Sequence, residues 1–231
     1  MAIYDINGTE LASGSSDVNI SKWNGKKIIV DGSSITSGGS GLTIPVWHDY
    51  LAEYLGVSIY DHSVSGTQWV WNYGSGGSYW RIQDYESDAD AVVIMGDYNS
   101  SWGSLGEISD ASDITAQYSY YSRLKAFAEA LIEKYPLIPI IWVIEPPRNF
   151  DGLLTPDVRC RQTAKAIQEV GELYGFPIAN CLINTIFRPY NATNYAANTS
   201  DGTHPWRNIQ RGMAQTIIET LKRTPIVYET S

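Results

Sequence analysis

The sequence contains few of the residues that hold metals or build disulfide frameworks. Among its 231 residues there are only two cysteines, Cys160 and Cys181, and three histidines. The cysteines do not form a C-x-x-C pair and the histidines are not paired at ligand spacing, so we expect no structural metal site. Two buried thiols are the favoured interpretation of the cysteines, with a disulfide as the alternative.

Positive charge and long apolar runs are also scarce. Sixteen Lys and Arg residues stand against 25 Asp and Glu residues, which gives a formal net charge of -9 at pH 7. Such a surface is a poor match for the phosphates of nucleic acid or for anionic membranes. No segment reaches the roughly 18 apolar residues of a membrane span, and the N-terminus lacks the basic start and apolar stretch of a signal peptide. We expect a soluble protein; its location, including secretion, and its oligomeric state stay open.

Short apolar runs and longer periodic segments alternate along most of the chain. Residues 1–25 are polar and rich in Gly and Ser, which predicts an N-terminal extension ahead of one domain at residues 26–231. Strands are expected at residues 27–30, 57–63, 91–95, 138–144 and, more weakly, 176–183. Helices are expected at residues 45–55, 121–135, 156–174 and 206–221. This order predicts an α/β fold, a three-layer α/β/α sandwich with a five-stranded, mostly parallel sheet.

Two adjacent serines follow the first expected strand, in the segment KKIIVDGSSITSGG. In a parallel sheet, reactive groups gather at the carboxyl ends of the strands, which is where Ser33 and Ser34 fall. A serine hydroxyl is a weak nucleophile until a base removes its proton, so a histidine with an orienting carboxylate is required. In the segment SDGTHPW, Asp201 and His204 are three residues apart in a turn, a spacing that can bring their side chains together.

The other two histidines have poor geometry for this role. His48 neighbours Asp49 within a helical pattern, and adjacent helical residues do not face each other. His62 neighbours Asp61 at the end of a strand, where successive side chains point to opposite faces. Both are interpreted as structural, and His62 is expected near the end of the cleft.

These motifs, in this order, resemble those of the SGNH hydrolases, also called the GDSL esterase/lipase superfamily. The family's first block, Gly-Asp-Ser-Ile-Thr-x-Gly, is matched by GSSITSG at residues 32–38 with one change, and Asp-x-x-His before the last helix is matched by Asp201 and His204. The resemblance spans about residues 26–221 and implies an SGNH, flavodoxin-like fold. It makes Ser34 the nucleophile, His204 the base and Asp201 its orienting carboxylate, with Ser33 in place of the family's supporting aspartate.

The blocks that supply the oxyanion hole match less completely. Gly66 in SVSGTQ matches the second block. Where the family has Gly-x-Asn-Asp, this sequence reads MGDYNSSW, with Asp97 and Tyr98 ahead of Asn99. Either Asn99 reaches the site one position late, or the asparagine has been lost and Asp97-Tyr98 continue the motif. The oxyanion hole implied by the resemblance consists of Ser34, Gly66 and, in the first case, Asn99; losing one donor costs about 100- to 1000-fold in turnover.

Aromatic residues are the side chains in this sequence that point to a kind of substrate. The chain has eight Trp and sixteen Tyr but four Phe, and several cluster in TQWVWNYGSGGSYW after Gly66. Tryptophan and tyrosine faces suit sugar rings and short acyl chains equally well, and most of these rings are expected to fill the core or surface. We expect one or two of Trp69, Trp71 and Trp80 to line the cleft.

The resemblance implies a cofactor-free serine esterase that acts through an acyl-enzyme on a small-molecule or glycan ester. No long apolar lid stands out in the sequence, so short-chain esters such as acetylated carbohydrates are favoured over long-chain triglycerides. The alternative is a glycan-binding module, for example on a phage tail or cell surface, that keeps the fold with weak or no catalysis. A thioesterase or lysophospholipase of the same family is not separated by the sequence.

Overall fold

A computed structural model describes residues 22–39, 44–71, 76–100, 103–116, 119–149 and 156–226. Nearly all of the predicted N-terminal extension therefore lies outside the described residues. Trp23 is the exception of most interest, because its side chain is fully buried and its indole N–H donates to the backbone oxygen of Leu221 at 3.1 Å. Trp23 thus packs with the domain, ahead of the boundary expected after residue 25.

The described residues form one sheet of five parallel strands in the order β2-β1-β3-β4-β5. The α/β prediction is confirmed, with every pairing parallel rather than most of them. The three middle strands are buried at almost every position, as expected for a sheet that is covered on both faces. The strand bounds are β1 Lys27–Gly32, β2 Ser58–Asp61, β3 Ala91–Gly96, β4 Ile140–Ile144 and β5 Ile178–Asn180.

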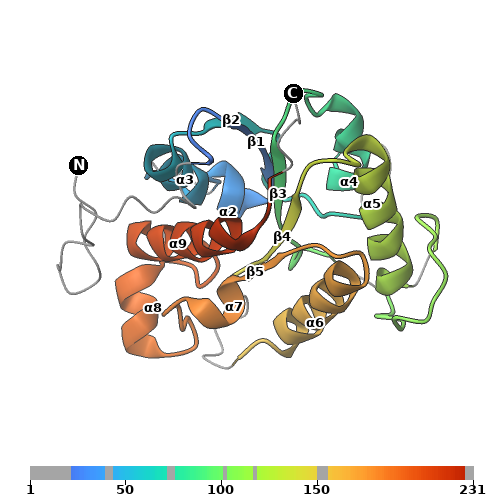
Figure 1. The fold of residues 1–231 in the computed structure, drawn as a ribbon. Coiled ribbons are helices and arrows are strands. Elements are labelled where there is room, and N and C mark those ends of the chain that lie inside the picture. Colours follow the sequence, from blue (N-terminus) through green and yellow to red (C-terminus); the bar gives the residue numbers. More distant parts are fainter. Residues whose placement is uncertain are drawn as a thin grey trace.

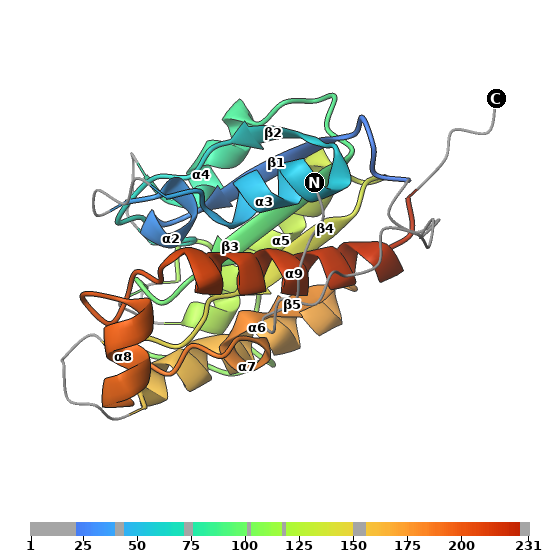
Figure 2. The same ribbon diagram turned by 90° about the vertical axis from the view of Figure 1, so that its left-hand side faces the viewer.

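Helices cover both faces of this sheet (Figure 1 and Figure 2). Helices α3 and α9 pack on one face, and α5 and α6 on the other. Their bounds are α3 Trp47–Leu55, α5 Tyr120–Lys134, α6 Val158–Leu173 and α9 Arg207–Arg223. Shorter elements are α2 Ser34–Ser37, α4 Ser78–Arg81, the 3-10 turn η1 Ile82–Asp84, α7 Cys181–Asn184 and α8 Ala192–Asn198.

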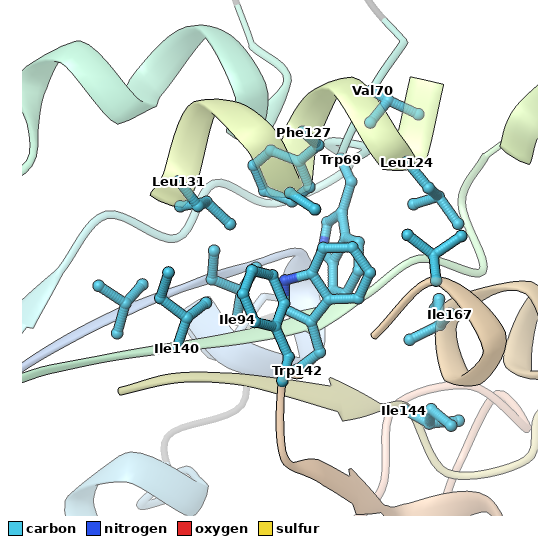
Figure 3. Close-up of a cluster of buried hydrophobic side chains, with 14 of the residues drawn as sticks. Trp69, Val70, Ile94, Leu124, Phe127, Leu131, Ile140, Trp142, Ile144 and Ile167 are labelled. Atoms are coloured by element: carbon cyan, nitrogen blue, oxygen red, sulfur yellow. The ribbon is translucent and has the colours of Figure 1, made fainter. Parts of the chain in front are cut away.

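Alternate strand residues enter two separate cores, because successive side chains in a strand point to opposite faces. Val30, Val93 and Val143 pack with α3 and α9. Ile94 and Trp142 pack on the opposite face with α5 and α6, together with Phe127 and Trp69 (Figure 3). The apolar runs in the sequence are continuous because both of these cores draw on the same strands.

The last expected strand is shorter than the sequence indicated. Strand β5 ends at Asn180, which pairs with Ile144 at the end of β4, and α7 begins at the next residue. Within the described part of the chain, the β4–β5 pairing ends at this residue pair, and residues 181–183 turn into a helix instead. Both cysteines are buried and free, as expected.

Candidate active site

The chain segments singled out in the sequence meet at the carboxyl edge of the sheet. Ser33 and Ser34 follow β1, residues 97–99 follow β3, and the turn at residues 199–206 leads into α9. The strand order reverses direction at β1, which lies between β2 and β3. In open α/β sheets the crevice beyond such a reversal is the usual place for a ligand.

A hydrogen-bonded chain joins three of the predicted residues. The Ser34 Oγ and His204 Nε2 are 2.7 Å apart, and His204 Nδ1 and Asp201 Oδ2 are 2.6 Å apart. Because the Asp201 carboxylate accepts the Nδ1–H, the neutral imidazole presents an unprotonated Nε2 to the serine hydroxyl. This is the tautomer that can remove a proton from Ser34.

The turn that carries Asp201 holds its carboxylate in the ionised form. Oδ1 accepts the backbone N–H groups of Thr203 at 2.9 Å and His204 at 2.8 Å, and Gly202, between Asp201 and Thr203, adopts φ 76°. Partial burial acts to raise the pKa of Asp201, but the hydrogen bonds from His204 and Thr203 outweigh it and lower the pKa to about 2. Asp201 is therefore an anion at neutral pH.

The other two histidines make contacts away from Ser34. His48 Nε2 lies 3.1 Å from the backbone oxygen of Thr36, and His62 Nε2 lies 2.8 Å from Glu86 Oε2. These contacts agree with the structural interpretation of both residues.

The loop after β2 brings Gly66 close to the nucleophile turn. The N–H of Val64 donates to the Gly32 oxygen at 3.0 Å, which ties this loop to the end of β1. A Cβ placed on Gly39 would lie 2.2 Å from Ser65 Oγ and 2.8 Å from Ser34 Cβ, so Ser65 and Ser34 flank the same spot. Gly66 itself has φ 79°, a conformation that favours glycine, and a Cβ placed on it would have no atom of the described residues within 4 Å apart from its two chain neighbours.

The loop after β3 distinguishes the two alternatives left open by MGDYNSSW. Asp97 and Tyr98 are almost fully buried, at 2% and 3% exposure. Asn99 is half-buried, and its side-chain Nδ2 donates to the Thr67 oxygen at 3.2 Å. Asn99 is thus the residue of this loop whose amide lies beside the Gly66 loop, which favours the first alternative.

The aromatic residues after Gly66 lie differently from one another. Trp69 is 1% exposed, its indole N–H donates to the Met95 oxygen at 3.1 Å, and its ring packs in the core (Figure 3). The expectation that Trp69 lines the cleft is therefore wrong. Trp71 and Trp80 are half-buried, and the Arg123 guanidinium lies 3.6 Å from the centre of the Trp71 ring.

One buried acidic residue at this edge was missed by the sequence interpretation. Glu145 directly follows β4, is 3% exposed, and accepts hydrogen bonds from Ser33 Oγ at 3.1 Å and from the Tyr98 N–H at 2.8 Å. Ser34 was selected because polar residues near the carboxyl end of a buried strand are candidates for a site. The same argument applied to the segment IIWVIE selects Glu145.

The described residues carry neither a metal-binding cluster nor a membrane-spanning helix. No group of three or more His, Cys, Asp or Glu side chains in them could hold a metal ion. None of their helices is both long and apolar enough to cross a bilayer.

No protein-family model and no curated protein sequence matches the chain, but several solved structures share its fold. A lipase/acylhydrolase from Enterococcus faecalis superposes with a TM-score of 0.62 at 18% identity, covering 85% of this chain and 95% of that one. A GDSL-like lipase candidate from Parabacteroides merdae gives 0.59 at 19% identity, with 86% and 96% covered. The chain has the fold of the SGNH/GDSL hydrolases. An acetylxylan esterase from Geobacillus stearothermophilus has this SGNH/GDSL fold too, with a TM-score of 0.54, 17% identity and coverage of 86% and 94%. The expected SGNH fold is thereby confirmed.

Proposed function

We propose that this protein is a serine esterase of the SGNH/GDSL superfamily that hydrolyses carboxylic esters through an acyl-enzyme on Ser34. The observation that carries the proposal is the hydrogen-bonded chain from Ser34 Oγ through the imidazole of His204 to Asp201, with contacts of 2.7 and 2.6 Å. Nucleophile, base and orienting carboxylate are the three parts that acyl transfer by serine requires.

The reaction proceeds in two half-reactions. Ser34 Oγ attacks the ester carbonyl while His204 Nε2 takes the hydroxyl proton, and Asp201 stabilises the resulting imidazolium. His204 then gives this proton to the leaving alcohol, and the acyl group stays on Ser34. A water molecule, deprotonated by His204, attacks the acyl-enzyme, the proton returns to Ser34 Oγ, and the carboxylic acid is released. No metal or organic cofactor takes part.

The oxyanion hole of this mechanism consists of the backbone N–H groups of Ser34 and Gly66 and the side-chain amide of Asn99. A side-chain amide nitrogen carries two N–H groups, and the contact of Asn99 with the Thr67 oxygen uses one of them. The second is then the donor to the developing negative charge.

Removing this donor tests the assignment of Asn99. We expect Asn99→Ala to lower kcat for p-nitrophenyl acetate about 100-fold while KM changes by less than about threefold, because the donor acts mainly in the transition state. Asn194→Ala is the matched control, since Asn194 in α8 also donates its amide to a backbone oxygen, that of Ile186 at 2.9 Å. Equal kcat values for Asn99→Ala and wild type would remove Asn99 from the oxyanion hole.

We further propose that the substrates are short-chain esters, in particular acetyl groups on carbohydrates. The acetylxylan esterase that shares the fold supports this class by its name. Trp206, two residues after His204, is 38% exposed and offers an aromatic face of the kind that contacts sugar rings. Trp71 and Trp80 remain the other candidates.

A panel of esters tests the substrate class. We expect kcat/KM for p-nitrophenyl acetate to exceed that for the octanoate at least about tenfold, and acetate to be released from acetylated xylan, because a small acyl site excludes a long chain. Faster hydrolysis of the octanoate would point instead to a lipase or thioesterase.

The position of Asn99, one residue later than in the family's Gly-x-Asn-Asp block, favours one second candidate, a glycan-binding module with ineffective catalysis. This candidate predicts that wild type hydrolyses no ester of the panel faster than Ser34→Ala does.

A further inference from the structure

We propose that Glu145 is a positioning residue that fixes the nucleophile turn and the Asp97–Asn99 loop relative to each other. The inference rests on the proposed esterase function and adds to it a residue that does not touch the ester. It is carried by the position of one buried carboxylate between two loops that come from different strands.

Each oxygen of Glu145 holds a different loop. Oε1 accepts the Ser33 hydroxyl at 3.1 Å, and Oε2 accepts the Tyr98 N–H at 2.8 Å. The backbone oxygen of Glu145 also accepts the Tyr98 hydroxyl at 2.9 Å. Since Glu145 directly follows β4, its carboxylate links the carboxyl ends of β1, β3 and β4.

The two residues that Glu145 holds are the immediate neighbours of groups in the proposed reaction. Ser33 precedes the nucleophile Ser34, and Tyr98 precedes the proposed oxyanion donor Asn99. A shift of either neighbour changes the distance between the attacking hydroxyl and the oxyanion donor. Misplacement of reacting groups by about 1 Å costs on the order of 100-fold in rate.

Glu145 has polar partners that limit the effect of its burial. Burial raises the pKa of Glu145 above its usual value, and the Tyr98 N–H, the positive charge of Arg148 and the Ser33 hydroxyl act against that rise. A buried carboxyl group without hydrogen-bond partners is unfavourable in free energy, so its oxygens stay on their donors. For Glu145 these donors are the Ser33 hydroxyl and the Tyr98 N–H.

Asp97, a second buried carboxyl group at this edge, does not make the same link. Burial raises the pKa of Asp97 to about 8, and its Oδ1 accepts the N–H of Trp69 at 2.9 Å, on the side of the core. Glu145 is the carboxylate that reaches Ser33. The first motif of the family carries an aspartate where this chain has Ser33, and here a carboxylate reaches that place from another strand.

The test is a double-mutant cycle on Glu145→Gln and Ser33→Ala, with kcat and KM measured on p-nitrophenyl acetate. Glutamine keeps the size of the side chain but offers one acceptor oxygen in place of two. We expect each single variant to lower kcat about 10-fold, with KM within about threefold of wild type. Because both changes break the same link, their effects on kcat should not multiply. The fold-loss of kcat in the double variant should be no more than about twice the fold-loss in the less active single variant.

Glu169→Gln is the matched control, because Glu169 on α6 accepts a hydrogen bond from the Tyr121 hydroxyl and lies outside the site. It should keep the wild-type kcat. Thermal unfolding of each variant shows which of them are folded at the assay temperature. If Glu145→Gln fails to fold, Ser33→Ala alone decides, and it must still lower kcat.

The positioning role is overturned if Ser33→Ala has the wild-type kcat, or if the two fold-losses of kcat multiply in the double variant. The esterase proposal still stands in that case, provided that hydrolysis by the wild type depends on Ser34. A wild type without Ser34-dependent hydrolysis overturns both proposals.

Discussion

Replacing Ser34 with alanine is expected to lower kcat for ester hydrolysis by about 10⁴-fold or more and to abolish covalent labelling by a fluorophosphonate probe. In the proposed mechanism the acyl group is carried by Ser34 Oγ, which lies 2.7 Å from His204 Nε2, so its removal leaves no place for the acyl-enzyme to form. The activity that remains in such variants comes from binding and from the oxyanion hole alone.

Intact mass after labelling is the measurement that separates Ser34 from its neighbour. Ser33 is 7% exposed and its hydroxyl donates to Glu145, whereas His204 Nε2 contacts the hydroxyl of Ser34. Ser33→Ala should therefore still gain the mass of one probe, although more slowly than wild type, whereas Ser34→Ala should gain none. Labelling of Ser34→Ala would place the nucleophile at another residue.

The layers of the fold were predictable because the signals for them are local. A strand buried on both faces must be apolar at every position, as Ala91–Gly96 and Ile140–Ile144 are. Helix ends carry their own signals as well, such as Gly56 in the left-handed conformation directly after α3. Asp201 and His204 were predictable for the same reason, since one tight turn brings both side chains together.

Glu145 and Trp69 were not assigned correctly because their environments depend on distant parts of the chain. Glu145 meets Ser33 only after β1 and β4 have taken their places on either side of β3. Trp69 follows the Gly66 loop, but its ring lies 5.5 Å from Phe127 and 5.1 Å from Trp142, centre to centre, which come from two other elements. A window of neighbouring residues does not contain these contacts, and the apolar core competes for the same aromatic rings as a cleft does.

The Asp97–Asn99 loop is an intermediate case. The sequence left two alternatives open, an asparagine at Asn99 that comes one position late or the loss of the family's asparagine. The choice between them depends on which side chains turn into the core. Asp97 and Tyr98 are buried, and the amide of Asn99 lies beside Thr67. The motif itself does not encode this packing, which is why the sequence alone left both alternatives open.

Replacing Asp201 with asparagine is expected to lower kcat about 10³-fold or more by inverting the tautomer of His204. The backbone N–H groups of Thr203 and His204 both donate to Oδ1, so the asparagine oxygen must take that position. Its NH₂ group then faces His204 Nδ1, which must accept, and Nε2 carries the proton. A protonated Nε2 cannot remove the proton of Ser34.

The same substitution has a defined pH dependence, which separates loss of the carboxylate from general damage to the turn. In the native state the pKa of Asp201 is about 2, below the usual 3.8, so its contacts stabilise the fold fully above about pH 4 and lose that effect between about pH 4 and pH 2. The Tm difference between wild type and Asp201→Asn should therefore shrink over this range. It should also be small, because the Asp201 side chain is 43% exposed and solvent screens its charge. A kcat close to that of wild type at pH 7, together with an unchanged Tm, would show that Asp201 does not set the tautomer of His204, and the base would then need another orienting group.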